Sequence, residues 1–120
     1  MKALIDTSIL IDHLNAVDDA TTALNTYDAY ISSITMNEIV RGAKSPNEYE
    51  SLLDLLSNFE VINIDRETYQ TAFALQREKG LDLQNALIYA TAKQAGLMLV
   101  TGNSRDFNSD WLDVKIPYTT

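Results

Sequence analysis

Near its N-terminus the chain reads Ala3-Leu4-Ile5-Asp6-Thr7-Ser8-Ile9-Leu10-Ile11: an apolar run, one acid, two hydroxyl residues and a second apolar run. The first run is typical of a strand in the middle of a parallel sheet, where burial of an unpaired carboxylate costs free energy. At the carboxyl end of such a strand the chain enters the crevice where open α/β folds bind ligands. Asp6 is therefore the first candidate for a functional carboxylate.

Outward from this segment, short apolar runs alternate with segments of helical periodicity along the whole chain. We expect strands at residues 2–6, 29–32, 60–64, 97–101 and 113–117. We expect helices at residues 8–15 and 19–27, from Thr35 to near Gly42, from Pro46 onward, from the cap Asp65 to Gly80, and from the cap Asp82 to Gly96. This alternation predicts an α/β fold with a mainly parallel five-stranded sheet that is covered by helices on both faces.

The composition narrows the classes of protein that this chain can belong to. A length of 120 residues with 46% hydrophobic residues predicts one domain, residues 1–120, with its own core. The absence of cysteine excludes a disulfide framework and a thiolate metal site. The first apolar run is too short for a signal peptide or a membrane span, so we expect a cytoplasmic protein without a membrane partner.

The net charge of −8 argues against a general nucleic-acid binder, whose affinity comes from Lys and Arg contacts to phosphates. It does not exclude a nuclease, because Mg²⁺ held by carboxylates meets the phosphate directly and Arg41, Lys44 and Arg105 supply local positive charge. The same acidity suits a basic protein partner.

Polar side chains follow three of the expected strands. Asp6 ends the first strand, Glu38 lies one turn into the helix after the second, and Asn103 lies just beyond the fourth. The carboxyl ends of parallel strands share one edge of the sheet, so we expect these side chains to converge, with Asn85 at the start of the helix before the fourth strand. Two carboxylates and amide oxygens are ligands that Mg²⁺ or Mn²⁺ prefers, and such a metal polarises a phosphoryl oxygen and lowers the pKa of a bound water.

Each of these residues also has a purely structural interpretation. Thr35 and Glu38 have the spacing of a capping box, in which Glu38 returns to the backbone N–H of Thr35. Asp6 fits the N-cap of the helix that begins near Ser8, and Asp82 fits an N-cap better than a ligand. Turn chemistry accounts equally well for Asn103 and Asp106.

Four sequence segments occur in order along nearly the whole chain. They are Ile5-Asp6-Thr7-Ser8, SITMNEIVRG at residues 33–42, NALIYATA at residues 85–92, and LVTGN at residues 99–103 followed by Asp106-Phe107. This set resembles the motifs of the PIN-domain family and, within it, the VapC-type toxins of bacterial type II toxin–antitoxin systems. The resemblance implies a PIN-like three-layer α/β/α fold and an Mg²⁺- or Mn²⁺-dependent endoribonuclease, a hydrolase that cuts structured RNA, often tRNA.

The resemblance also implies partners and residue roles. A cognate VapB-like antitoxin silences such toxins and can insert a basic side chain into the acidic site, and the toxin forms a homodimer or a toxin–antitoxin hetero-oligomer. The catalytic positions are Asp6, Glu38, Asn85 and Asn103, of which Asp6, Glu38 and Asn85 are the metal ligands. The residues that line the site are Thr7, Ser8, Thr101 and Asp106.

One position departs from the family pattern. The third motif of the family begins with Asp, whereas this chain has Asn85. An amide keeps one oxygen ligand but removes a full negative charge beside a divalent cation, so metal affinity should fall steeply. Asp82, one turn earlier, is a possible substitute acid, although its capping role directs it to the backbone. Three accounts fit: a weakened enzyme, a binding-only relative, and a toxin inactivated by deliberate substitution.

Two other classes of protein stay open on the sequence. One is a receiver-type phosphoacceptor domain with Asp65 as acceptor, Thr101 as switch hydroxyl and Lys115 as basic partner. Receivers present two adjacent acids after the first strand, however, and here Asp6 is followed by Thr7. The other class is a metal-free interaction module.

Overall fold

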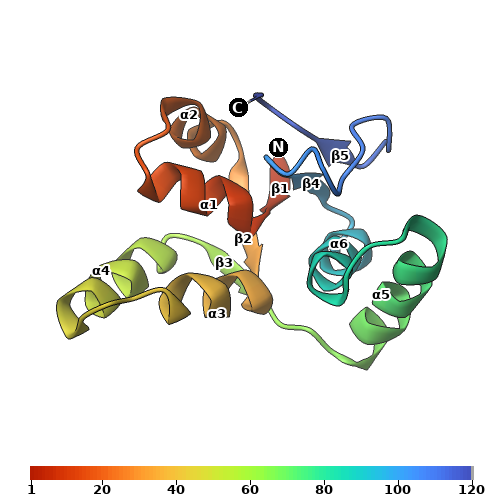
Figure 1. Cartoon of the computed structure of the whole chain (residues 1–120), viewed down its shortest axis with the longest axis horizontal. Helices are drawn as coiled ribbons and strands as arrows, with labels where there is room; N and C mark the ends of the chain where they lie inside the picture. Colours follow the sequence, from red (N-terminus) through yellow and green to blue (C-terminus); the bar gives the residue numbers. More distant parts are fainter. Residues whose placement is uncertain (120) are drawn as a thin grey trace.

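A five-stranded sheet forms the centre of the molecule (Figure 1). The computed structural model describes residues 1–119. The strands are β1 (Lys2–Ile5), β2 (Asp28–Ser32), β3 (Glu60–Ile62), β4 (Met98–Val100) and β5 (Val114–Lys115), in the spatial order β3-β2-β1-β4-β5. Every neighbouring pair of strands is parallel. The expected α/β fold with a parallel sheet is therefore confirmed.

Helices cover both faces of this sheet (Figure 1). They are α1 (Thr7–Leu14), α2 (Asp18–Thr26), α3 (Ser33–Arg41), α4 (Pro46–Leu56), α5 (Arg66–Lys79) and α6 (Leu83–Ala95). Helices α1 to α4 pack on one face, and α5 and α6 pack on the other. The helices and the sheet between them give a three-layer α/β/α arrangement.

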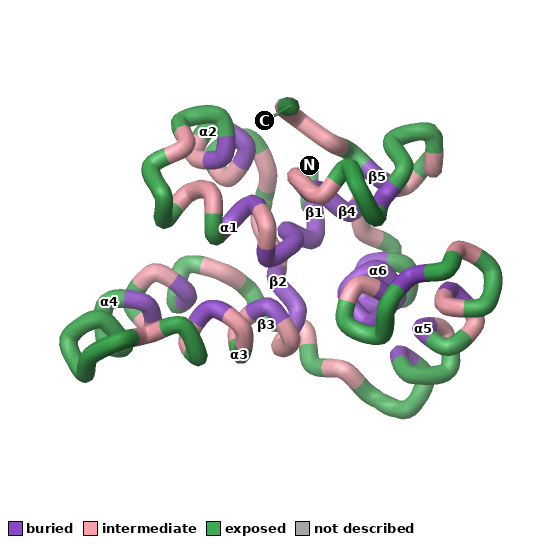
Figure 2. Tube along the Cα trace, in the orientation of Figure 1, coloured by how far each residue is buried: buried purple, intermediate pink, exposed green. Residues whose placement is uncertain are grey.

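The two faces of the sheet bury separate apolar clusters because successive strand residues point to opposite faces. Leu4 and Leu99 contribute to the cluster under α5 and α6. Their neighbours Ala3, Ile5 and Val100 contribute to the cluster under α1 to α4. Figure 2 shows the buried residues along β1, β2 and α6, as expected for central elements covered on all sides.

Most element boundaries lie within two residues of those expected, and two differences have clear causes. Helix α3 begins at Ser33 rather than at Thr35, because the Ser32 hydroxyl accepts the backbone N–H of Ile34 at 3.1 Å and caps the helix there. Strand β5 ends at Lys115, two residues before Pro117, which has no N–H to donate to the sheet.

The parallel arrangement brings the carboxyl ends of β1, β2 and β4 to one edge of the sheet, where α1, α3 and the loop after β4 begin. That edge is where open α/β sheets bind their ligands. Within residues 1–119, no helix has both the length and the apolar character needed to cross a bilayer.

Candidate active site

Asp6 lies at the junction of β1 and α1, and only 3% of it is exposed. Its backbone N–H donates to the carbonyl of Val100 at 2.9 Å, which holds the end of β1 against the end of β4. Its Oδ2 accepts hydrogen bonds from Ser8 Oγ at 2.7 Å and from Thr101 Oγ1 at 2.8 Å. Asp6 occupies the N-cap position of α1, as the capping interpretation expects, but its side chain makes no capping hydrogen bond and is bound by Ser8 and Thr101 instead.

The two hydroxyls that bind Asp6 also hold the loop after β4. Ser8 Oγ accepts the backbone N–H of Gly102, and Thr101 Oγ1 accepts that of Asn103, both at 3.0 Å. Each hydroxyl thus donates to the carboxylate and accepts from the loop, which satisfies both of its hydrogen-bonding roles. The position of Asn103 is therefore tied to that of Asp6.

Glu38 lies on α3 and accepts a hydrogen bond at Oε1 from Thr7 Oγ1 at 2.8 Å. Thr7 Oγ1 also lies 2.9 Å from Oγ1 of the buried Thr35. Since Ser32 is the residue that caps α3, Thr35 lies inside the helix and the capping-box interpretation of Glu38 is wrong. The sequence did not lead us to expect the contact of Thr35 with Thr7. The available signal was that Thr35 lies three residues before Glu38, which puts Thr35 and Glu38 on one face of the helix.

Both acids have raised pKa values. Burial raises the pKa of Asp6 above its ordinary value, against the opposing effect of the Ser8 and Thr101 hydrogen bonds. Burial also raises the pKa of Glu38, against the opposing hydrogen bond from Thr7. A pair of desolvated acids whose charge is not balanced by the protein is typical of a functional site that receives a cation.

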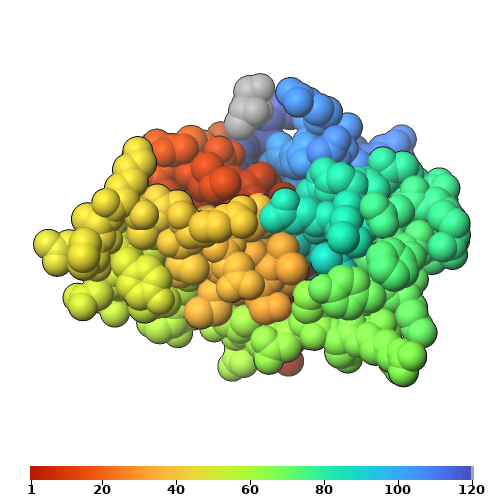
Figure 3. Space-filling view, turned by 60° about the horizontal axis from the view of Figure 1, so that its bottom comes forward, coloured from red at the N-terminus to blue at the C-terminus, as the bar shows by residue number. Residues whose placement is uncertain are grey.

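The charges of two neighbouring acids act on Glu38 at this edge of the sheet. Beyond the effect of its burial, Glu38 has its pKa raised by the carboxylates of Asp6 and Asp82, while Arg41 acts in the opposite direction. Figure 3 shows the surfaces of α1 in red, α3 in yellow-orange and α6 in teal meeting side by side. Asp82 on α6 therefore belongs to the same electrostatic environment as Asp6 and Glu38.

Asn85 belongs to a second group of polar residues. Its Nδ2 donates to Oδ2 of Asp106 at 3.0 Å and to Oδ2 of Asp82 at 3.3 Å. Asn103 Nδ2 donates to the same Asp106 oxygen at 3.0 Å. Asp82 caps α6, accepting the backbone N–H of Asn85 at 2.8 Å. Asp106 is thus the acid that joins the third and fourth motifs.

The expected site residues therefore form two connected groups. The first group surrounds Asp6 and contains Thr7, Ser8, Glu38 and Thr101. The second group surrounds Asp106 and contains Asp82, Asn85 and Asn103. Thr101 links the two groups through the backbone of Asn103. Across residues 1–119, no three Asp, Glu or His side chains converge closely enough to hold a metal ion.

The geometry does not support the receiver interpretation. Asp65 caps α5, where it accepts the backbone N–H of Thr68 at 3.0 Å, and this capping bond lowers its pKa. Asp65 follows β3, which is the outermost strand on one side of the sheet. Thr101 follows β4 and Lys115 ends β5, and both strands lie beyond β2 and β1 on the other side. The three residues that a receiver brings together therefore lie at opposite sides of the sheet.

A family model described as "PIN domain" matches residues 3–109, which include the residues of both polar groups. This chain belongs to the PIN-domain family. In this PIN domain Asp6, Glu38 and Asn103 follow the carboxyl ends of β1, β2 and β4. No curated protein sequence matches the chain.

Solved structures place this PIN domain among chains of toxin–antitoxin complexes. It is 36% identical to a chain of a toxin–antitoxin complex from Klebsiella pneumoniae, with a TM-score of 0.92 over 99% of this chain and 100% of that chain. It shares its fold with VapBC2 from Rickettsia felis bound to a promoter DNA fragment (24% identity, TM-score 0.76, 96% and 98% of the chains). It also shares its fold with FitAcB from Neisseria gonorrhoeae (21% identity, TM-score 0.75, 96% and 97%).

Proposed function

We propose that this PIN domain is the toxin of a toxin–antitoxin pair, with the site of a metal-dependent endoribonuclease weakened by Asn85. The observation that carries the proposal is the position of Asp6 and Glu38 at the carboxyl edge of the sheet, where Thr101 links them to the group around Asp106. The full-length similarity to a chain of the Klebsiella pneumoniae toxin–antitoxin complex supports the toxin assignment. The substrate class we propose is structured RNA, such as tRNA.

The residues at this edge offer the oxygen donors that a divalent cation prefers, but they carry one negative charge fewer than the ligand set of the family. Asp6, Glu38 and the amide oxygen of Asn85 would hold Mg²⁺ or Mn²⁺, because carboxylate and amide oxygens are the donors these cations prefer. When bound, the cation supplies the positive charge that polarises a phosphoryl oxygen of the substrate. With an amide at position 85, one negative charge of the family's ligand set is missing, and the affinity for the cation falls.

The protein itself contributes positioning. Thr7 orients Glu38, and Ser8 and Thr101 orient Asp6, so both carboxylates are fixed before substrate arrives. Arg41 lies close enough to Glu38 to lower its pKa, so its positive charge is also available to a phosphate at this edge.

A cleavage assay with Mn²⁺ on a panel of tRNAs tests the proposal by comparing this chain with the variant Asn85→Asp. We expect the variant to cut about ten- to a hundredfold faster, since the loss of even an outer-shell partner of a metal ligand changes metal affinity or activity by about that factor. The matched control is the double variant Asp6→Asn with Asn85→Asp, which should be inactive.

Two results would contradict the proposal in different ways. Equal cleavage by the chain and by Asn85→Asp means that residue 85 is not a ligand position. No cleavage by either protein with metal present counts against the nuclease function itself.

The proposed protein partner is a cognate VapB-like antitoxin with a basic segment, which suits a toxin of net charge −8. Coexpression with the product of the short open reading frame beside this gene tests this partner. We expect one complex on size exclusion that contains one or two copies of the toxin. We also expect the partner to inhibit the RNA cleavage that the Asn85→Asp variant carries out. Separate elution of the two products would exclude that pair.

A metal-free interaction module is the second candidate, and one observation favours it. The amide of Asn85 donates to both Asp82 and Asp106, which satisfies these two acids without a cation. Calorimetry with Mn²⁺ separates the candidates: an interaction module shows no binding even after Asn85→Asp, whereas the nuclease site binds more tightly after that change.

A further inference from the structure

We propose that Tyr89, Phe107 and Trp111 form an aromatic clamp that positions Asn103 and Asp106 against Asn85. Tyr89 lies on α6, whereas Phe107 and Trp111 lie on the loop between β4 and β5. A role for this clamp in RNA cleavage rests on the proposed function, but the positioning itself is measurable without cleavage.

The three rings contact one another in favourable geometries. Tyr89 and Trp111 are stacked, with ring centroids 5.6 Å apart and planes 8° apart. Phe107 meets Tyr89 edge to face at 5.9 Å and Trp111 edge to face at 6.5 Å. Both arrangements are those that aromatic pairs prefer, and each adds stability beyond the buried area.

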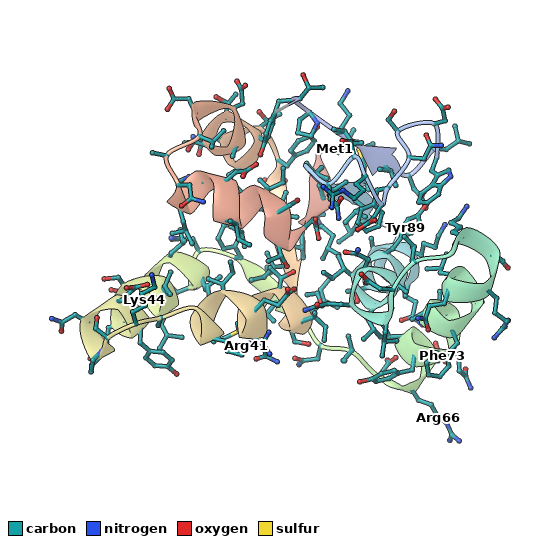
Figure 4. All side chains as sticks on the ribbon, viewed as in Figure 1. Met1, Arg41, Lys44, Arg66, Phe73 and Tyr89 are labelled. Atoms are coloured by element: carbon teal, nitrogen blue, oxygen red, sulfur yellow. The ribbon has the colours of Figure 1, made fainter. Side chains whose placement is uncertain are left out.

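Charged groups complete the clamp. The Tyr89 hydroxyl donates to Asp113, and Lys93 Nζ lies 2.8 Å from the other carboxylate oxygen of Asp113. Lys93 Nζ also lies 4.6 Å from the Tyr89 ring centroid, and Lys79 Nζ lies 4.3 Å from that of Trp111. The far end of the loop is therefore attached to α6 through Asp113 and to α5 through Trp111. Figure 4 labels Tyr89 on α6, toward the C-terminal loop.

The clamp acts directly on the site because its members neighbour the site residues in sequence. Tyr89 lies one helical turn after Asn85 on α6, and Phe107 follows Asp106. Phe107 N–H donates to the Asn103 carbonyl at 3.1 Å, and Asp106 N–H donates to Asn103 Oδ1 at 3.2 Å. A shift of the buried Phe107 ring would therefore move both Asn103 and Asp106.

The backbone of this loop does not provide the same attachment. The hydrogen bonds of the Ser104, Phe107 and Trp111 N–H groups go to carbonyls of the same loop, at Gly102, Asn103 and Asn108. They shape the loop without attaching it to α6. The distance between Asn85 and Asp106 therefore depends on side chains, among them the three rings of the clamp.

Solvent exchange of the Asn85 and Asn103 side-chain NH₂ protons, measured by NMR, tests the clamp, because both amides donate to Asp106. In Trp111→Leu we expect these protons to exchange about tenfold faster, since both aromatic contacts of Trp111 are lost while an apolar side chain is kept. In the conservative variant Trp111→Phe we expect exchange within about twofold of the unchanged chain.

Tyr69→Leu is the matched control, since it removes an aromatic ring from α5 that pairs with Phe73 at 6.2 Å. Unchanged exchange in Trp111→Leu overturns the clamp, and so does equal acceleration in Tyr69→Leu, which would point to a general loss of stability. If Trp111→Leu does not fold, Tyr89→Phe takes its place. It keeps the ring, loses the bond to Asp113, and should raise exchange at Asn103 about threefold, whereas no rise overturns the clamp.

These outcomes are independent of the cleavage assay. Faster amide exchange in Trp111→Leu together with no RNA cleavage by Asn85→Asp would keep the clamp and exclude the nuclease. The reverse pair of results would keep the nuclease and exclude the clamp.

Discussion

The side-chain nitrogen of Asn85 lies 3.0 Å from a carboxylate oxygen of Asp106 and joins α6 to the loop after β4. The same nitrogen lies 3.3 Å from Asp82. An amide N–H attracts both acids, whereas a carboxylate at this position would repel them. Asn85 therefore favours the stability of the metal-free protein, whereas an Asp at position 85 would favour the binding of a cation.

The first prediction concerns stability with and without metal. Asn85→Asp should lower the free energy of unfolding by about 1–2 kcal/mol without metal, because it removes two hydrogen bonds to carboxylates and adds a like charge. Mn²⁺ should restore at least part of that loss, which thermal unfolding with and without Mn²⁺ measures. Asn47→Asp, the same change at an exposed position in the first turn of α4, is the control; it should lose no stability without metal, because a negative charge is favourable near a helix N-terminus, and Mn²⁺ should not change it. Equal behaviour of the two variants would contradict the prediction.

The second prediction concerns the buried hydroxyl of Thr101, which donates to Asp6 and accepts from the Asn103 backbone. Thr101→Val keeps the shape but removes one of the two hydroxyl hydrogen bonds to Asp6 Oδ2 and leaves the Asn103 N–H without its acceptor, so we expect a loss of about 2–3 kcal/mol. Thr101→Ser keeps the hydroxyl and loses one methyl group, so we expect a loss of about 1 kcal/mol. Urea unfolding measures both values. A serine variant no more stable than the valine variant would mean that the hydroxyl contributes little.

The third prediction concerns pH. Burial raises the pKa of Asp6 above its ordinary value of 3.8, so the folded protein binds the proton more tightly than the unfolded chain. Ionisation of Asp6 therefore opposes folding. The contribution of Asp6 to the free energy of unfolding falls as pH rises from its ordinary pKa in the unfolded chain through its raised pKa in the folded protein. Asp6→Asn removes this contribution, so the variant should gain stability relative to the unchanged chain as pH rises above the ordinary pKa of 3.8.

Chemical denaturation at several pH values measures this difference. Asp54→Asn on the exposed face of α4 is the control for the loss of one charge. A stability difference for Asp6→Asn that is constant with pH would show that Asp6 is not responsible.

The fourth prediction separates two glycines. Gly96 ends α6 with φ of +67°, where a side chain is strained even though a Cβ would meet no atom within 4 Å. Gly96→Ala should therefore cost about 1–2 kcal/mol. At Gly102 a Cβ would lie 3.5 Å from the Tyr118 hydroxyl and 3.6 Å from Ser8 Oγ, which are ordinary contacts. Gly102→Ala should cost less than about 0.5 kcal/mol, and thermal unfolding of both variants checks the order.

The fold was predictable from the sequence because its signals are local. The apolar run that ends at Asp6 marks a buried strand, and Asp65, Asp82, Gly80 and Gly96 mark helix ends by their residue types alone. The edge of the sheet at which the motifs gather then follows from parallel strand order. These features need no knowledge of which distant residues touch.

The contacts within the site were not predictable in the same way. Thr101 and Asp6 are 95 positions apart, and Asn85 and Asp106 are 21 positions apart. Whether these pairs meet depends on the register of β1 with β4 and on the course of an irregular loop. Residue type also allowed a cap for Asp6 and a capping box for Glu38, whereas in the structure Ser8 and Thr101 bind the Asp6 carboxylate and Ser32 caps α3.

The stacked pair of Tyr89 and Trp111 has a practical consequence, because Trp111 is the only tryptophan in the chain. The tryptophan fluorescence of this protein therefore comes from one place, the loop that carries Asp106 and Trp111. Its emission spectrum is an intrinsic optical reporter for events at this loop. Binding of the proposed antitoxin or RNA at this loop would change this emission and could be followed in real time without attaching any dye.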